Sequence, residues 1–206
     1  MKTVDFLFSR CYNRETKGRF SVEHFLIKKP RYNFMRNVFT TKRLCRAGVI
    51  AALYVALTYA FMPFAFGPFQ VRPAEALCIL PLFFPEAVPA LYVGCILSNL
   101  ASPYFFYDVC IGSLVTLCAG LGTYFIGKWI KKTALKVFVG GLFPVLLNAV
   151  FIPMIIVFLC GDLGGQASVF AAYSFFALSL FLTESVWVYG LGIPLYYAVS
   201  KLQNKL

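Results

Sequence analysis

Charged residues are scarce in this sequence. They make up 13% of its 206 residues, whereas about 25% is usual for a soluble domain. Apolar residues make up 60% of the chain, and the mean hydropathy is +0.77. This composition excludes an ordinary soluble domain. It indicates an all-α integral membrane protein with a single transmembrane domain.

Histidine and the common catalytic motifs are also lacking. The only histidine, His24, lies in a basic N-terminal segment, which excludes a His-based metal site or a Ser-His-Asp triad in the apolar region. There is no HExxH sequence and no GxxxxGK[ST] sequence, so the chain does not hydrolyse ATP through a P-loop. Nothing in the sequence indicates an enzyme, and no bound cofactor is expected.

The cysteines show no pairing pattern. There are seven, an odd number, and no CxxC occurs. A disulfide framework or a zinc site requires closer pairing. The cysteines are therefore predicted to be small packing residues within a helix bundle.

Basic residues are concentrated at the start of the chain. The first 46 residues carry twelve of the 19 Lys and Arg residues and three acidic residues. This distribution predicts a basic cytoplasmic tail near anionic lipid and no nucleic-acid binding. Residues 47–200 are predicted to form the transmembrane domain, and residues 201–206 a short C-terminus.

Apolar stretches predict a compact bundle of about six transmembrane helices. Two of these helices are shorter than the roughly 20 residues of an untilted span, so they form either short spans or a re-entrant pair. The last stretch is too long for one straight span and is predicted to include a loop or a tilted extension. Pro144 and Pro153 are predicted to kink the fifth helix. The predicted ranges are 47–66, 73–84, 87–100, 108–127, 137–160 and a part of 167–200.

The basic segments predict the orientation. Lys and Arg occur mainly in the N-terminal tail, between Lys128 and Lys136, and at the C-terminus. Six crossings place all three on one side, which is the cytoplasm by the positive-inside rule. The protein is thus predicted to lie in the plasma membrane with both termini in the cytoplasm. Polar residues then collect in the outer half of the bundle, which favours a pocket over a pore.

Carboxylate, guanidinium and amide groups in such a setting predict a ligand site, because charges are costly to bury in a membrane. Carboxylates accept hydrogen bonds and amides both donate and accept, so the set suits a small polar heterocycle, including a positively charged one. The candidate substrate-binding residues are Gln70, Arg72, Glu75, Asn99, Asp108, Asn148 and Glu184.

Each candidate also has a purely structural interpretation. Glu75 can cap the second helix or pair with Arg72. Asp108 can cap the fourth helix, and Asn99 and Asn148 can join neighbouring helices. Glu86 is interpreted as a solvated turn residue.

Small residues recur every fourth position in the first helix, at Gly48, Ala52, Ala56 and Ala60. Such a ridge lets another helix approach closely. The spacing fits equally a docking face for a partner protein and packing inside the same bundle.

The stretch GPFQVRPAEAL at 67–77, continued by Leu80-Pro81, resembles the queuosine-precursor (QueT) transporter family. Further similarity occurs at Ala51–Thr58, at Gly94-Cys95 with Ser98-Asn99, and from Asp108 to Leu117. Asn148 and Glu184, the latter before Gly190-Leu191-Gly192, also match family positions. The resemblance covers roughly residues 47–200.

The resemblance implies the substrate-binding S component of an energy-coupling factor (ECF) transporter. Expected partners are a transmembrane coupling protein and two cytoplasmic ATPases, which use the ATP. The implied substrate is a 7-deazaguanine such as preQ1 or queuine. The Gly48/Ala52/Ala56/Ala60 ridge becomes the expected docking face. The alternatives are an S component for another vitamin-like substrate, or a stand-alone membrane carrier or scaffold.

Overall fold

Long apolar helices dominate the part of the chain that the structure describes. A computed structural model of the protein describes residues 40–67 and 69–203, and these contain helices and no strand. Most of the predicted N-terminal tail and the end of the C-terminus lie outside these residues. The described residues belong to one compact unit, Thr40–Leu206.

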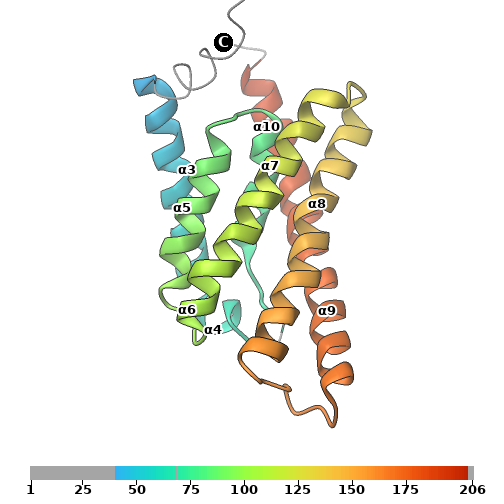
Figure 1. Ribbon diagram of the computed structural model, residues 1–206. Helices are drawn as coiled ribbons and strands as arrows, with labels where there is room; N and C mark the ends of the chain where they lie inside the picture. The colour runs from blue at the N-terminus through green and yellow to red at the C-terminus, as the bar shows by residue number, and fades with distance from the viewer. Residues whose placement is uncertain (1–39, 68, 204–206) are drawn as a thin grey trace, which may run out of the picture. The chain divides into compact units, whose positions relative to one another are not determined.

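Long helices and several short helical turns follow one another (Figure 1). In chain order they are α3 (Thr41–Ala60), α4 (Met62–Ala65), η1 (Pro73–Leu82), α5 (Ala87–Asn99), α6 (Phe105–Tyr107), η2 (Asp108–Gly112), α7 (Ser113–Trp129), α8 (Thr133–Met154), η3 (Ile155–Leu159), α9 (Val169–Ser185), η4 (Val186–Leu191) and α10 (Gly192–Gln203).

Four continuous helical stretches of the described chain have the length and composition to cross a membrane: Thr41–Ala60, Phe105–Trp129, Thr133–Leu159 and Val169–Leu202. Two shorter apolar helices, η1 and α5, accompany them. The prediction of an all-helical membrane bundle is confirmed. The four long stretches account for four of the six predicted membrane crossings, and the other two would be the short helices η1 and α5.

The last apolar stretch is predicted to include a loop or a tilted extension, and the structure agrees with the second alternative. It is helical throughout, from α9 through η4 to α10, and contains no loop. Its 34 residues correspond to about 50 Å, well beyond the roughly 30 Å of a hydrocarbon core, so this helix is tilted or extends beyond the membrane. The π turn in η4 takes up one extra residue without ending the helix. Pro144 and Pro153 likewise lie inside a continuous α8.

The first helix also begins earlier than predicted. It starts at Thr41 instead of near Ala47, so Lys42, Arg43 and Arg46 belong to its first turns. Its buried residues, Ile50, Tyr54 and Thr58, recur every fourth position and face the other helices.

The small-residue ridge lies on the other side of α3. Its residues are two positions out of step with the buried ones, which is about 200° around a helix. All four ridge residues, Gly48, Ala52, Ala56 and Ala60, are exposed. The described part of the bundle therefore does not use this ridge for its own packing, and a docking role stays a prediction.

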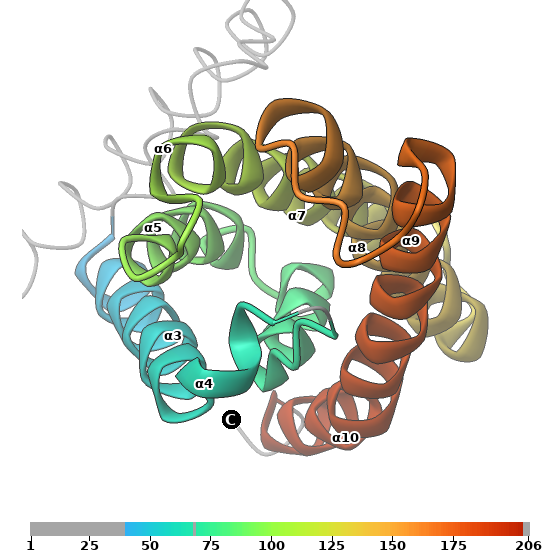
Figure 2. The same ribbon diagram turned by 90° about the horizontal axis from the view of Figure 1, so that it is seen from below.

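The short helix η1 is the central element. All ten of its residues are buried, and it packs against α3, α5, α7, α8, α10 and η4. In the view from below, η1 lies inside a ring formed by the long helices and α5, with α4 at the rim beside the end of α3 (Figure 2). The sequence around Glu75 is thus the innermost part of the bundle.

The 3-10 geometry of η1 corrects the prediction of an α-helix from Pro73 to Phe84. A 3-10 helix rises about 2.0 Å per residue, so ten residues span roughly 20 Å. Pro81 lies inside it, and proline has no N–H with which to continue an α-helical pattern. In this geometry residues three apart share one edge, which aligns Glu75 with Cys78.

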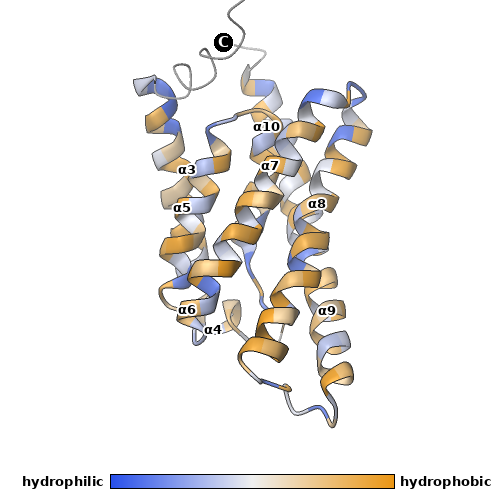
Figure 3. Ribbon diagram, viewed as in Figure 1, coloured by the Kyte–Doolittle hydropathy of each residue, from blue (hydrophilic) through white to orange (hydrophobic). Residues whose placement is uncertain are grey.

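Basic ends of the described helices collect at one end of the bundle. The start of α3, the connection between α7 and α8, and the end of α10 lie at the top in Figure 1, where hydrophilic residues are also visible in Figure 3. The α5–α6 connection and the α8–α9 loop lie at the opposite end.

Glu86 corrects the interpretation of a solvated turn residue. Its side chain is only 2% exposed, and its Oε1 accepts a 2.6 Å hydrogen bond from Nη1 of Arg46. Because Arg46 belongs to α3, the pair joins the start of α3 to the start of α5. A buried carboxylate requires such a partner.

Candidate functional site

A small buried cavity lies around the start of η1, in the half of the bundle away from the basic ends. Its lining residues come from the segment before η1, from η1 itself, and from α5, η2, α7, α8 and α9. They are Gln70, Arg72, Glu75, Cys95, Asn99, Asp108, Gly112, Thr116, Asn148, Ile152 and Glu184. All seven residues selected from the sequence are among them. Their role as substrate contacts stays a prediction.

Glu75 is held by two donors from the protein. The hydroxyl of Tyr54 donates a 2.6 Å hydrogen bond to its Oε1, and the thiol of Cys78 donates a 3.1 Å hydrogen bond to its Oε2. No side-chain hydrogen bond caps η1, and no ion pair within 4 Å joins Glu75 to Arg72 in the described part of the chain. The observed contacts of Glu75 therefore match neither a helix cap nor an ion pair with Arg72.

Glu184 is less completely held. Nδ2 of Asn148 donates a 3.1 Å hydrogen bond to its Oε1, which links α8 to α9. Its Oε2 is buried and accepts no hydrogen bond from the described residues. The side chain is 4% exposed. Leaving a buried acceptor unpaired is costly, so this oxygen is the best available acceptor for a donor that enters the cavity.

Asp108 and Asn99 form a second polar group. The hydroxyl of Ser102 donates to Oδ2 of Asp108, and Nδ2 of Asn99 donates a 2.8 Å hydrogen bond to the main-chain oxygen of Asp108. Asn99 thus connects the end of α5 to η2, as its structural interpretation predicted. Asp108 opens the π turn η2 and makes no side-chain cap there.

Arg72 enters the cavity from the segment before η1. Its Nε donates a 2.9 Å hydrogen bond to the carbonyl of Ala65, and its guanidinium carbon lies 5.0 Å from the ring centre of Phe66. No carboxylate of the described chain lies within ion-pair distance of this buried cation. Its remaining N–H groups are available for a ligand.

Gln70 has strained backbone geometry beside the cavity. Its φ is +41°, in the left-handed region that residues other than glycine rarely adopt. Its N–H bonds to the carbonyl of Gly67 at 3.0 Å, which closes a tight turn. Strained conformations of this kind cluster at ligand sites, where surrounding contacts impose them.

The cavity is acidic and small. Three carboxylates and one guanidinium line it, so the ionised set favours a ligand with positive charge. Its volume is about 10 Å³, which is room for about one water molecule. A bicyclic heterocycle therefore fits only when lining groups move apart. The described residues contain no cluster of His, Cys, Asp and Glu arranged to hold a metal ion.

Sequence reasoning missed several residues around the cavity. Tyr54 and Cys78 hold Glu75, while Cys95 and Thr116 line the wall between α5 and α7 and are joined by a 3.3 Å hydrogen bond. All four lie in apolar or small-residue stretches, where the periodicity predicts ordinary packing. The one sequence feature that could have identified Tyr54 is its position on the face of the first helix that packs against the bundle.

The α8–α9 loop is joined to the segment before α6 at the same end of the bundle. The hydroxyl of Tyr104 donates to Oδ2 of Asp162, and the N–H of Gly164 donates a 2.8 Å hydrogen bond to Oδ1. The bond from Tyr104, and then the bond from Gly164, lower the pKa of Asp162 below its usual 3.8. Burial, followed by the bond to Asp162, raises the pKa of Tyr104.

We expect this contact to make stability depend on pH. A carboxylate with a lowered folded-state pKa stabilises the fold above its unfolded-state pKa, and this contribution is lost as the pH falls through the folded-state value. Tyr104→Phe should therefore lower the free energy of unfolding at pH 7 by no more than about 1 kcal/mol, because Asp162 is partly exposed. The difference should begin to shrink as the pH falls below about 3.8 and should disappear only below the lowered folded-state pKa.

Thermal unfolding of wild type and Tyr104→Phe across this pH range measures the effect. Tyr107→Phe, a change at the neighbouring tyrosine of α6, is the control. A difference between wild type and Tyr104→Phe that persists unchanged below pH 3.8 would contradict the assignment.

Apolar helices around a buried polar cavity define the class of this protein: a multi-pass membrane protein with polar side chains gathered inside its bundle. The chain belongs to the QueT transporter family, whose model matches residues 44–201. Membership indicates transport, and not catalysis, as the activity. Searches of curated proteins and of solved structures found no match.

Proposed function

We propose that this protein is the substrate-binding S component of an ECF-type importer and captures a queuosine precursor of the 7-deazaguanine type from outside the cell. Family membership supports the transport role. The observation that carries the substrate is the acidic cavity, in which Oε2 of Glu184 has no partner among the described residues.

The ligand chemistry matches the cavity. A guanine-type edge presents adjacent N–H donors, and carboxylate oxygens accept them. The aminomethyl group of preQ1 adds a cation, which suits a cavity with more carboxylates than guanidinium groups. Glu184 is the primary acceptor in this proposal because its Oε2 is unpaired, while Tyr54 and Cys78 hold Glu75 in position.

The proposed orientation follows from the charges at the helix ends. Lys and Arg residues at the start of α3, around the α7–α8 connection and near the end of α10 collect at one end (Figure 3). By the positive-inside rule, this end lies on the cytoplasmic side of the plasma membrane. The cavity then lies in the outer half and receives substrate from outside.

The energy for uptake comes, in this proposal, from partner proteins. No P-loop sequence occurs in the chain. A transmembrane coupling protein would contact the exposed Gly48/Ala52/Ala56/Ala60 ridge, and two ATPase subunits would hydrolyse the ATP.

Binding of preQ1 to the purified full-length chain tests the proposal. Isothermal titration should show saturable binding of preQ1, and guanine, which lacks the aminomethyl cation, should bind more weakly. Mass spectrometry of small molecules that copurify provides an independent measurement. A different vitamin-like molecule in the preparation would overturn the substrate. Uptake in cells that lack the coupling protein and ATPases would overturn the ECF assignment.

Gly112→Ala should weaken preQ1 binding without unfolding the protein. A Cβ at this position meets Nδ2 of Asn99 at 3.5 Å, an ordinary contact, but it occupies part of a cavity that is already small. We expect affinity to fall on the order of tenfold, with the midpoint of thermal unfolding nearly unchanged. Gly120→Ala is the control, since its Cβ meets Val88 at 3.6 Å, away from the cavity. Equal affinities of the two variants would contradict the assignment of Gly112 to the site.

A further inference from the structure

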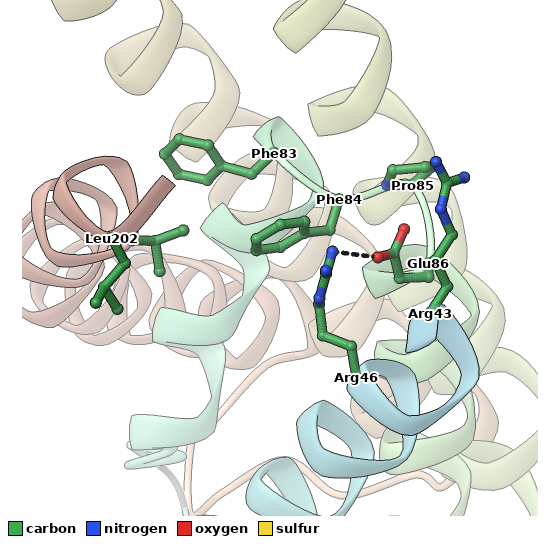
Figure 4. Close-up of a pocket in the computed structure, with 8 residues that line it drawn as sticks. Arg43, Arg46, Phe83, Phe84, Pro85, Glu86 and Leu202 are labelled. Carbon is green, nitrogen blue, oxygen red and sulfur yellow. Dashed lines mark hydrogen bonds and ion pairs between the residues drawn. The ribbon is translucent and has the colours of Figure 1, made fainter. Parts of the chain in front are cut away.

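A second, larger pocket opens at the other end of the bundle, among the basic helix ends. Its volume is about 530 Å³, within the range of small-molecule sites. It lies between the start of α3, the connection from η1 to α5, and the end of α10 (Figure 4). None of its lining residues belongs to the cavity around Glu75. They are Arg43, Arg46, Phe83, Phe84, Pro85, Glu86, Val199 and Leu202.

One wall of this pocket is apolar. Phe83 and Phe84 leave η1 together, and Val199 and Leu202 face them from α10. Phe83 also packs against Tyr196, with ring centres 4.5 Å apart. This wall offers a hydrocarbon surface of the kind that an acyl chain contacts.

The other wall is polar and carries two arginines, Arg43 and Arg46. Arg46 is committed to protein contacts: its guanidinium carbon lies 4.4 Å from the ring centre of Phe84, and its Nη1 bonds to Oε1 of Glu86. Arg43 has no ion pair with any described carboxylate. A guanidinium in this position offers the planar set of donors that phosphate binds best.

Besides the guanidinium of Arg43, the carboxylate of Glu86 also indicates a ligand in this pocket. Glu86 lines the pocket, and its buried Oε2 has no hydrogen-bond partner among the described residues, so a ligand reaches this oxygen once the side chain turns toward the pocket. A pure anion would be repelled by this oxygen. A ligand that places phosphate on Arg43 and a hydroxyl donor on Glu86 satisfies both groups.

We infer that this pocket binds one anionic phospholipid with a hydroxylated headgroup, of the phosphatidylglycerol type. Its phosphate lies on Arg43, a glycerol hydroxyl donates to Oε2 of Glu86, and the start of an acyl chain follows Phe83 and Leu202. Because Arg46 and Glu86 neutralise each other, the pocket carries a single net positive charge, which matches this lipid. Basic pockets between helices at the cytoplasmic surface typically bind anionic headgroups. The inference does not depend on the transported substrate.

Native mass spectrometry of the full-length chain tests the inference. The protein is purified in detergent, mixed with phosphatidylglycerol, and the lipid retained on the folded protein is counted. Arg43→Gln should retain one lipid fewer or bind it about tenfold more weakly, as expected for the loss of one charge-assisted hydrogen bond. Lys42→Gln removes the same charge from the adjacent position outside the pocket and should behave as wild type.

The role of Glu86 is tested with lipids, since a variant at this position would also leave Arg46 unpaired. Phosphatidylmethanol has the charge of phosphatidylglycerol but no headgroup hydroxyl, and it should bind several-fold more weakly. Equal retention of the two lipids would overturn the role of Glu86. Equal retention by Arg43→Gln and wild type would overturn the site. Stronger binding of phosphatidylethanolamine than of phosphatidylglycerol would overturn the anionic assignment.

Discussion

Glu184→Gln should abolish high-affinity binding of preQ1 and leave the fold intact or more stable. Oε2 of Glu184 is buried without a partner, so the carboxylate costs free energy in the absence of ligand. The neutral amide of glutamine removes part of this cost and still accepts from Asn148. It also removes the charge that a donor or cation of the ligand requires. Affinity should fall at least about 100-fold, a typical result of losing one partner of a buried charged contact.

Isothermal titration and thermal unfolding together decide the role of Glu184. A purely structural residue would give normal affinity and a lower unfolding midpoint, which is the opposite pattern. Asp162→Asn is the control for the loss of a carboxylate, because Asp162 lies in the α8–α9 loop and does not line the cavity. Normal affinity of Glu184→Gln would remove Glu184 from the proposed site.

Glu75→Gln gives a useful contrast within the same experiment. Both oxygens of Glu75 accept hydrogen bonds, from Tyr54 and from Cys78. An amide NH₂ in place of one oxygen faces a donor, so this variant should lose both affinity and stability. The unfolding midpoint should therefore fall for Glu75→Gln and stay unchanged or rise for Glu184→Gln. This difference distinguishes Glu75, whose two oxygens both accept hydrogen bonds, from Glu184, whose Oε2 accepts none from the described residues.

The double substitution Ala52→Leu with Ala56→Leu should stop uptake and leave substrate binding unchanged. Both residues lie exposed on the outer side of α3, opposite the face that packs against the bundle. Small side chains there allow a partner helix to approach closely, and two leucines keep it away. Uptake in whole cells should fall on the order of tenfold or more, because the coupling protein is lost.

The measurements are uptake of labelled preQ1, copurification of the coupling protein, and titration of the isolated chain. Ser174→Leu, which adds bulk at an exposed position of α9, is the matched control and should transport normally. Normal uptake by the double variant would show that α3 does not form the interface. Loss of preQ1 binding by the isolated variant would show that the helix had been disturbed.

The pocket proposed for lipid and the cavity proposed for substrate lie at opposite ends of η1. Glu75 follows Pro73 at its start, and Phe83 follows Leu82 at its end. The two proposals are therefore tested by separate substitutions. Failure of either leaves the other standing, because the pockets share no residue.

The residues of the candidate site were largely predictable from the sequence. Glu75, Asp108 and Glu184 lie in or beside apolar stretches, where a charge is tolerated only inside the bundle or at a water-filled space. That constraint is local to each residue, and it was sufficient to select side chains that the structure brings to one cavity. The same constraint and the composition predicted an all-helical membrane domain.

The protein groups that hold those side chains were not predictable. Tyr54 meets Glu75 only because α3 packs against η1, and Cys78 reaches the same carboxylate because η1 is a 3-10 helix. Periodicity treats both as ordinary buried residues. Glu86 was misjudged for a related reason: its partner, Arg46, belongs to another helix, so turn propensity alone indicated exposure.

The sequence by itself determined that this chain enters a membrane, where its charges lie along the chain, and which polar residues are too costly to face lipid. These are properties of single residues and their neighbours, governed by transfer free energy. The tertiary structure decided which carboxylate is satisfied and which oxygen remains open. It also showed that the small-residue ridge faces outward and that a second pocket lies among the basic ends. Such properties depend on contacts between distant segments, and only packing brings those segments together.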